Sequence, residues 1–327
     1  MQSINLGILE TQGITGTQAY SKGLYKQLNK ICRQALLSCM ICFVVLTVIP
    51  YFWIDPVLKL IGVVDAQLEI VKELILYSFP AMSLRVLNDN IKVFIQNQDK
   101  LSIVGISNFT VFILWIPITF VIVNNMENKS EAYGVGLMVY EVICLLANFY
   151  IIYQKCNKKC LNASEPIWKG FGKFFWYSFK ISLSGWLIYV FLDAMTVMLQ
   201  QRKDESQVAA YSIFYNITMV IVSLIAGFYV YARNILNYFL GQKRTEEAKN
   251  LFKRFYWVYL YFNLLMMVVI SVMLLGTCVS NLIDDKSLRH WLLVSTPFVF
   301  GIGLCILQTI FASKGLMSIG FLKFQII

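Results

Sequence analysis

Long apolar stretches alternate along this chain with short polar connectors. A helix that crosses a hydrocarbon core about 30 Å thick needs about 20 predominantly apolar residues. Several stretches reach that length, while residues 4–20 are only mildly apolar and are expected to be the end of a helix. The pattern therefore predicts an all-α, polytopic helical membrane protein with about eight full transmembrane helices and a partial first one. The predicted full spans are Gln34–Ile54, Val71–Asn97, Ser102–Val123, Tyr133–Tyr153, Phe174–Leu199, Val208–Tyr231, Phe255–Leu275 and Trp291–Ser313.

Composition narrows the class of protein further. Hydrophobic residues make up 58% of the chain, charged residues 14%, and the mean hydropathy is +0.65. Ordinary soluble domains have roughly half apolar and a quarter charged residues, so a soluble globule is excluded. The net charge is +10. Because the basic residues lie in the connectors between spans, we assign this charge to membrane topology and expect no nucleic-acid partner.

The sign of the charge alternates from one connector to the next. Connectors 21–33, 92–100, 155–180 and 233–254 are net basic. The intervening connectors, 55–73, 124–131, 201–207 and 281–291, are neutral or net acidic. Lys and Arg collect on the cytoplasmic side of membrane proteins, so the basic set is expected to be cytoplasmic.

The stretch 70–100 carries three charges near its middle. Asp89 lies four residues after Arg85 and three before Lys92, so the three side chains share one helical face. A charge at the centre of a membrane helix costs roughly 2.5–3.5 kcal/mol. These residues either neutralise one another at a helix–helix contact or line a transport path, and the sequence leaves both interpretations open.

Three further polar residues lie inside apolar spans. Asp193 has no basic residue within a helical turn, and it is either a functional acid or a structural, hydrogen-bonded one. Glu141 is similarly isolated and either faces a cavity or makes a polar interhelical contact. Asn216 either orients a ligand or bridges two packed helices.

Two pairs of segments repeat in the same order along the chain. Ser78, Pro80 and Phe94 match Ser295, Pro297 and Phe311 at one common offset. The connector after Tyr20 likewise resembles the one after Leu240. Both members of each pair lie on the same side of the membrane, which indicates parallel repeats related by an axis along the membrane normal. Completing both repeats would require helices before residue 1 and after Ile327, so we expect the parent architecture to have two six-helix lobes.

Several segments resemble the multidrug and toxic compound extrusion (MATE) family, in its eukaryotic branch. QGITGTQAYSKGLYKQLNKICRQA is similar to that family's second helix and connector, and FPAMSLRVLNDNIKVFIQNQ to its fourth helix. YGVGLMVYEVICLLANFYIIY is similar to its sixth helix, and AAYSIFYNITMVIVSLIAGFYVYARNILNYFLGQKRTEEAKN to its eighth. The family's seventh helix usually has two acids five residues apart. Asp193 fits the second position, whereas Ile188 occupies the first.

The resemblance implies a two-lobe antiporter fold, here without the family's first and last two helices. It assigns 1–154 to an N-terminal lobe (part of helix 2 and helices 3–6), 155–173 to a cytoplasmic linker and 174–327 to a C-terminal lobe (helices 7–10 and the start of 11). It implies export of amphiphilic organic cations in exchange for protons or sodium, by a monomer in the plasma membrane or a vacuolar-type membrane. The alternatives are a lipid-linked saccharide flippase of the same superfamily and an inactive truncated remnant. The candidate coupling and substrate-binding residues are Asp193, Glu141, Asp89, Arg85 and Asn216.

The sequence offers little for other chemistries. Neither Cys39 with Cys42 nor Cys156 with Cys160 has the second ligand pair that a zinc site needs, so we expect no metal. There is no phosphate-cradling Gly-Lys-Ser/Thr loop and no nucleophile–base pattern, so we expect neither ATP-driven transport nor an enzyme. No cofactor is expected beyond the coupling ion.

Overall fold

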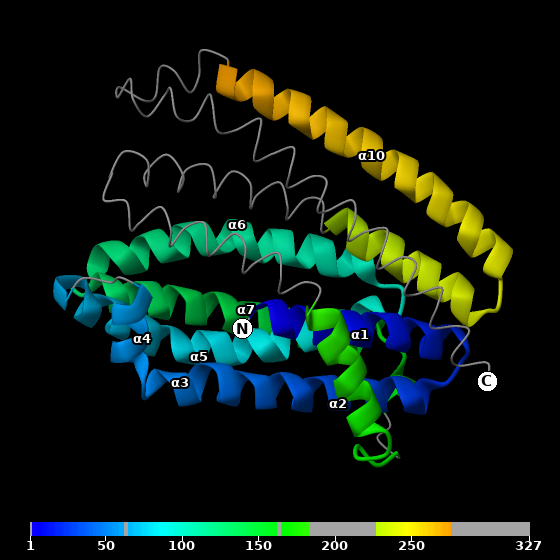
Figure 1. The fold of residues 1–327 in the computed structure, drawn as a ribbon, viewed down its shortest axis with the longest axis horizontal. Coiled ribbons are helices and arrows are strands. Elements are labelled where there is room, and N and C mark those ends of the chain that lie inside the picture. The colour runs from blue at the N-terminus through cyan, green and yellow to red at the C-terminus, as the bar shows by residue number, and fades with distance from the viewer. Residues whose placement is uncertain (1, 62–64, 162–164, 184–226, 276–327) are drawn as a thin grey trace. The chain divides into compact units, whose positions relative to one another are not determined.

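The computed structural model describes residues 2–61, 65–161, 165–183 and 227–275, and every regular element within these ranges is helical (Figure 1). Residues 171–183 and 227–241 are helical in addition to the labelled elements. The labelled elements are α1 (Gln2–Ser21), α2 (Tyr25–Phe43), the π-helical turn η1 (Val44–Val48), α3 (Ile49–Tyr51), α4 (Ile54–Ile61), α5 (Asp65–Gln96), α6 (Leu101–Asn125), α7 (Lys129–Lys155), the 3-10 turn η2 (Lys158–Leu161) and α10 (Thr245–Leu275).

The predicted helices are confirmed wherever the structure describes them. Three of the described helices are long and apolar enough to cross a membrane: 25–51, 101–125 and 129–155. One expectation is corrected, because residues 25–33 form the first turns of α2 and not a connector, so that only a short turn separates α1 from α2. The π-helical turn ends two residues before Pro50, whose ring removes a backbone N–H from the helical ladder. The span 291–313 and most of the spans 174–199 and 208–231 lie outside the described residues.

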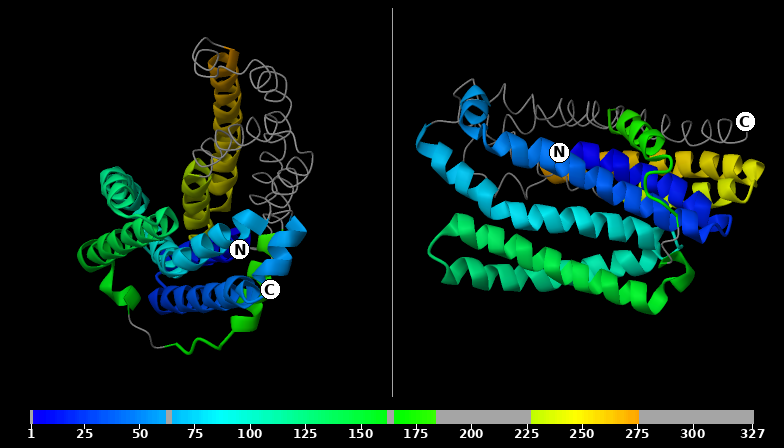
Figure 2. Two further views of the ribbon diagram at one scale, coloured as in Figure 1. Left: turned by 90° about the vertical axis from the view of Figure 1, so that its left-hand side faces the viewer. Right: turned by 90° about the horizontal axis from the view of Figure 1, so that it is seen from below.

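The chain divides into two compact units, Met1–Trp186 and Leu187–Ile327. In the first unit, α5 is the central helix, with α1 and α2 packed on it from one side and α7 from the other; α6 packs mainly on α7 (Figure 2). At 32 residues, α5 is about 48 Å long, which exceeds the thickness of a hydrocarbon core. The lobe limits expected from the sequence stay a prediction.

Close contact between α5 and α7 depends on a small residue. A Cβ atom at Gly134 of α7 would lie 2.6 Å from the Cβ and carbonyl oxygen of Tyr77 on α5. Two residues further along α7, the carbonyl of Gly136 accepts a hydrogen bond of 2.9 Å from the indole N–H of Trp115 on α6. Small residues let membrane helices approach closely and gain van der Waals contact, so Gly134 sets the separation of these two helices.

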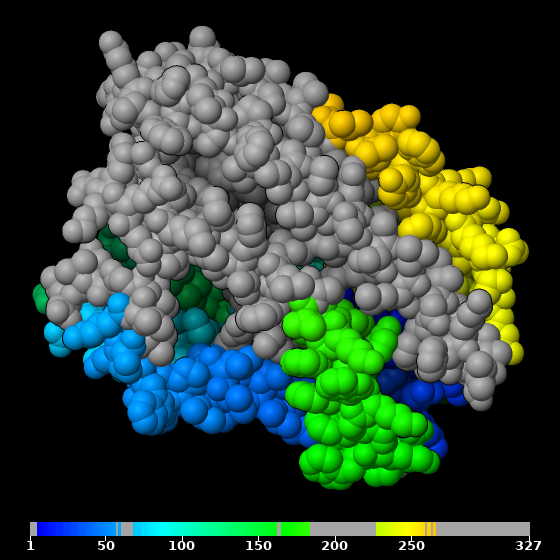
Figure 3. All heavy atoms as spheres, in the orientation of Figure 1, coloured from blue at the N-terminus to red at the C-terminus, as the bar shows by residue number. Residues whose placement is uncertain are grey.

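The segment that follows α7 is fastened to α2. Gln34 donates its amide to the carbonyls of Ile167 and Lys169 at 2.6 and 3.2 Å, and Lys30 forms an ion pair with Glu165 at 2.8 Å. In the space-filling view, the part containing residues 165–183 lies against α2 (Figure 3). The hydrogen bond from Lys30 lowers the pKa of Glu165, so this ion pair is present at neutral pH and is lost as the pH falls through that lowered value.

In the second unit, residues 227–241 and α10 form a helical hairpin. Leu236 and Leu240 pack with Ala248 at the bend between the two helices. Arg244 pairs with Glu247 in the first turn of α10, and Lys249 pairs with Glu246 at 2.8 Å. Acidic residues in the first turn stabilise a helix through its macrodipole, which explains why α10 begins here.

Replacing Gly134 with Ala should destabilise the protein. The new methyl group would force α7 away from Tyr77, and overpacking of this kind costs about 1–3 kcal/mol, or roughly 2–8 °C in melting temperature. Thermal unfolding in detergent measures the change. Gly105→Ala on α6 is the matched control, because nothing lies within 4 Å of a Cβ at that position. Equal melting temperatures for the two variants would contradict the assigned role of Gly134.

Candidate functional site

The charged face predicted for the stretch 70–100 exists on α5. Asp89 lies between two cations: its Oδ2 is 3.8 Å from Nε of Arg85, and its Oδ1 is 3.6 Å from Nζ of Lys92. The side chain of Arg85 is 57% exposed, that of Asp89 35% and that of Lys92 16%. The three charges thus run from the surface of the unit toward its interior, and Lys92 is the most enclosed.

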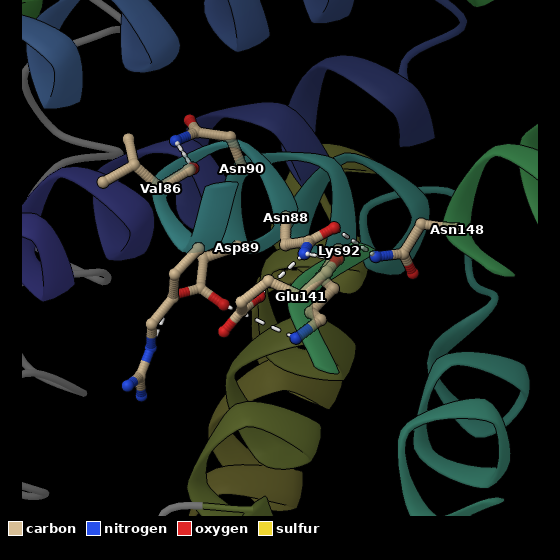
Figure 4. Close-up of polar contacts among 8 residues, drawn as sticks. Val86, Asn88, Asp89, Asn90, Lys92, Glu141 and Asn148 are labelled. Carbon is tan, nitrogen blue, oxygen red and sulfur yellow. Dashed lines mark hydrogen bonds and ion pairs between the residues drawn. The ribbon is translucent and has the colours of Figure 1, made fainter. Parts of the chain in front are cut away.

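Glu141 on α7 reaches the same region from the facing helix (Figure 4). Its exposed fraction is 6%, and its Oε2 accepts a hydrogen bond of 2.7 Å from Nδ2 of Asn88. The same amide donates to the backbone carbonyl of Glu141 at 2.7 Å. Asn148 completes the network by donating to Oδ1 of Asn88 at 3.3 Å. The carboxylate of Glu141 is therefore part of an interhelical contact and not an isolated group.

Helical spacing explains how these side chains meet. On α7, Glu141 and Asn148 are seven residues apart, which places them two turns apart on one face. On α5, Asn88 and Lys92 are four residues apart and share the face next to that of Asp89. Because α5 and α7 pack along each other, the two faces meet and the amide of Asn88 lies between the carboxylate and Asn148.

On its other side, α5 and the residue that follows it are bound to α1 through amide and hydroxyl groups. Gln12 donates to the backbone carbonyl of Asn90 at 3.0 Å, and Asn97 donates to the carbonyl of Gln12 at 3.1 Å. Thr17 donates to Oδ1 of Asn97 at 3.0 Å. In Figure 4, Asn90 points away from the Glu141 network. These contacts involve no charged side chain, and we assign them to helix packing.

The network can hold a proton or a cation. Two carboxylates, Asp89 and Glu141, lie near two cations from α5. Among the described residues, Asn88 is the side chain that donates to the enclosed carboxylate, Glu141. A carboxylate removed from water gains much from binding either a proton or an organic cation. Within the described ranges, no three His, Cys, Asp or Glu side chains are grouped as metal ligands.

The structure thus brings together three of the five residues singled out from the sequence: Arg85, Asp89 and Glu141. Asp193 and Asn216 lie outside the described residues. Sequence reasoning missed Asn88 and Asn148 as partners of Glu141. A signal was available, since both are amides inside apolar spans and Asn148 stands at helical spacing from Glu141.

Comparison with protein families gives one match. The profile of the MatE family matches residues 4–121 and 181–320, more than half of the chain. A comparison of the sequence with curated proteins gives no match.

Solved structures share the fold at low sequence identity. The crystal structure of the eukaryotic MATE transporter AtDTX14 matches with a TM-score of 0.78 at 14% identity, covering 98% of this chain and 72% of that one. The outward-facing conformation of a multidrug resistance MATE family transporter of the MOP superfamily matches with a TM-score of 0.74 at 14% identity, covering 97% and 72%. A MATE structure in complex with MaD3S matches with a TM-score of 0.72 at 14% identity, also covering 97% and 72%.

Removing the amide of Asn88 should destabilise the protein more than removing the whole pair. Asn88→Leu leaves the buried carboxylate of Glu141 without its donor, at a cost of about 1–3 kcal/mol. Adding Glu141→Leu removes the stranded charge, so the double variant should recover at least half of the lost melting temperature.

The melting temperatures of the unaltered chain, the two single variants and the double variant form a double-mutant cycle, which thermal unfolding measures. Asn125→Leu, an exposed amide at the end of α6, is the control and should leave the melting temperature unchanged. Strictly additive losses in the cycle would mean that Asn88 and Glu141 do not stabilise each other.

Proposed function

This chain belongs to the MatE family, and from that premise we propose that it exports amphiphilic organic cations in exchange for protons or sodium ions, by alternating access across a membrane. The observation that supports this most directly is the enclosed carboxylate of Glu141 beside Asp89 and Lys92. In this proposal the protein lies in the plasma membrane or a vacuolar-type membrane. It works as a monomer and uses no cofactor beyond the coupling ion.

The proposed coupling rests on competition for one acid. A carboxylate in poorly hydrated surroundings binds a proton strongly, and it also attracts an organic cation, but it holds only one of the two at a time. If the site faces the two sides of the membrane in turn, a proton entering from one side expels the cation to that side. Glu141 meets the first requirement, because it is 6% exposed and lies within a helix long and apolar enough to cross the membrane.

The other candidate residues keep the roles expected from the sequence. We propose Asp193 as the coupling acid of the C-terminal lobe and Asn216 as a ligand-orienting amide. Asp89 would supply the second negative charge of the N-terminal site, held in place by Arg85 through the ion pair of 3.8 Å. These assignments are independent, so each is tested by its own variant.

Glu141→Gln should abolish proton-coupled transport. The amide has the shape of the protonated acid, so the fold is preserved while the site can neither release a proton nor attract a cation. We expect uptake of tetraphenylphosphonium into acid-loaded proteoliposomes to fall at least about tenfold, the loss expected for a residue whose charge is used in the cycle. Glu127→Gln, in the exposed turn before α7, should transport normally. Undiminished uptake by Glu141→Gln would remove Glu141 from the coupling site.

Asp193→Asn should also abolish pH-gradient-driven efflux of a fluorescent organic cation. Its predicted span, 174–199, contains no other acid that could take over the exchange of a proton for a cation. The matched control is Asp204→Asn, which changes an acid in the predicted connector 201–207. Efflux by Asp193→Asn at the rate of the unaltered chain would contradict its coupling role without affecting that of Glu141.

A further inference from the structure

We propose that Lys92 is the resident counter-cation of Asp89 and Glu141, and that a transported cation or a proton takes its place during the exchange cycle. The inference rests on the proposed function, since it names the group that the transported cation must displace. It assigns a role to a residue that the sequence pattern treated only as one member of a neutral triad.

The first observation is position. Lys92 lies four residues after Asn88, which binds Glu141, and three after Asp89, which carries the second carboxylate. In Figure 4 its side chain extends into the region between α5 and α7 where Glu141 lies. The ammonium therefore stands beside both acids of the site and on the same helix as one of them.

The second observation is burial. Two cations flank Asp89, and Lys92 is the enclosed one, at 16% exposure against 57% for Arg85. An ammonium withdrawn from water in a membrane span requires negative charge nearby. Arg85 lies at the surface of the unit, whereas Lys92 depends on the carboxylates.

The third observation is that the ion pair is loose. Nζ of Lys92 is 3.6 Å from Oδ1 of Asp89, beyond the 2.7–2.9 Å usual for a charge-assisted hydrogen bond. Lysine also carries its charge on a flexible four-carbon stem with rotatable donors. A loosely held ammonium of this kind can move aside when another cation arrives, at little cost in broken hydrogen bonds.

The fourth observation is the balance of charge. Three charged groups act on Glu141, namely Arg85, Asp89 and Lys92, all on α5. The neighbouring titratable groups on other elements are Tyr140 and Cys144 of α7, and Cys39 of α2 lies near Asp89. With both acids ionised, the two negative and two positive charges of these described residues cancel. An entering cation must therefore either displace Lys92 or add an uncompensated charge.

Displacement gives Lys92 a specific effect on affinity. As long as it competes for the carboxylates, a bound cation is held weakly enough to leave again. Removing the charge of Lys92 would leave an excess negative charge, so cations would bind more tightly and be released more slowly. A purely structural lysine would have the opposite effect, because its loss would damage the site and weaken binding.

The test compares Lys92→Gln with Lys92→Arg, which keeps the charge, and with the exposed Lys155→Gln as control. Tetraphenylphosphonium binding is measured on the full chain in nanodiscs, and its transport in proteoliposomes. Lys92→Gln should bind about tenfold more tightly and transport more slowly, since one unit charge near a partly buried acid changes binding by at least that factor. Lys92→Arg and Lys155→Gln should bind as the unaltered chain does. Unchanged or weaker binding by Lys92→Gln overturns the inference.

A second readout needs no transported cation. Dicyclohexylcarbodiimide labels protonated carboxyl groups in apolar surroundings, and mass spectrometry of the labelled peptide locates the label at Glu141. In Lys92→Gln, labelling of Glu141 should extend to higher pH, and Lys92→Arg should restore the original profile. An unchanged profile overturns the inference. If neither the unaltered chain nor any variant binds tetraphenylphosphonium, the proposed function fails, and a shifted labelling profile then supports Lys92 only as the counter-cation of Glu141, with its displacement by a transported cation overturned.

Discussion

The packing of α5 between two pairs of helices is the constraint on which the first unit depends. A membrane helix has no water with which to satisfy its polar groups, so each must find a partner inside the protein. On one side, the backbone of α5 accepts from Gln12, and Asn97, directly after α5, exchanges hydrogen bonds with α1. On the other side, Asn88 binds Glu141 and Asn148 of α7. The polar residues that make α5 a poor membrane span by composition thus hold the unit together.

This arrangement links the charge of Glu141 to the packing of two helices. Asn88 donates to both the carboxylate and the backbone carbonyl of Glu141, so one amide fixes the side chain and the helix that carries it. Any change in the charge of Glu141 alters a hydrogen bond across the α5–α7 contact. Gly134 holds the same contact at close range, which leaves the helices little freedom to separate in response. A change of charge is then more easily absorbed by side-chain movement, and Lys92 is a flexible side chain whose ion pair with Asp89 is 3.6 Å long.

Spacing along the sequence predicted the faces of the helices but not their partners. The shared face of Arg85, Asp89 and Lys92 followed from helical geometry and is confirmed by two ion pairs. The hydrogen bond from Asn88 to Glu141 could not be predicted, because 53 residues separate the two and periodicity does not reveal which helices are neighbours. The start of α2 was placed too late, since its first turns are basic and a hydropathy pattern cannot distinguish a polar helix end from a connector. The family and the helical membrane fold, in contrast, followed from the order and number of the apolar segments.

The internal repeat sharpens the meaning of the charged face. The counterpart of α5 in the later repeat is the predicted span Trp291–Ser313. This span contains no charged residue, so nothing in it matches Arg85, Asp89 or Lys92. Since the shared fold does not require these charges, their retention in one repeat needs another cause. If these residues only packed helices together, apolar side chains would stabilise the contact as well or better, because a buried ion pair adds little to stability over a well-packed apolar contact. A site in which charges are exchanged does require them, and this asymmetry favours placing that site on the α5–α7 face of the first unit.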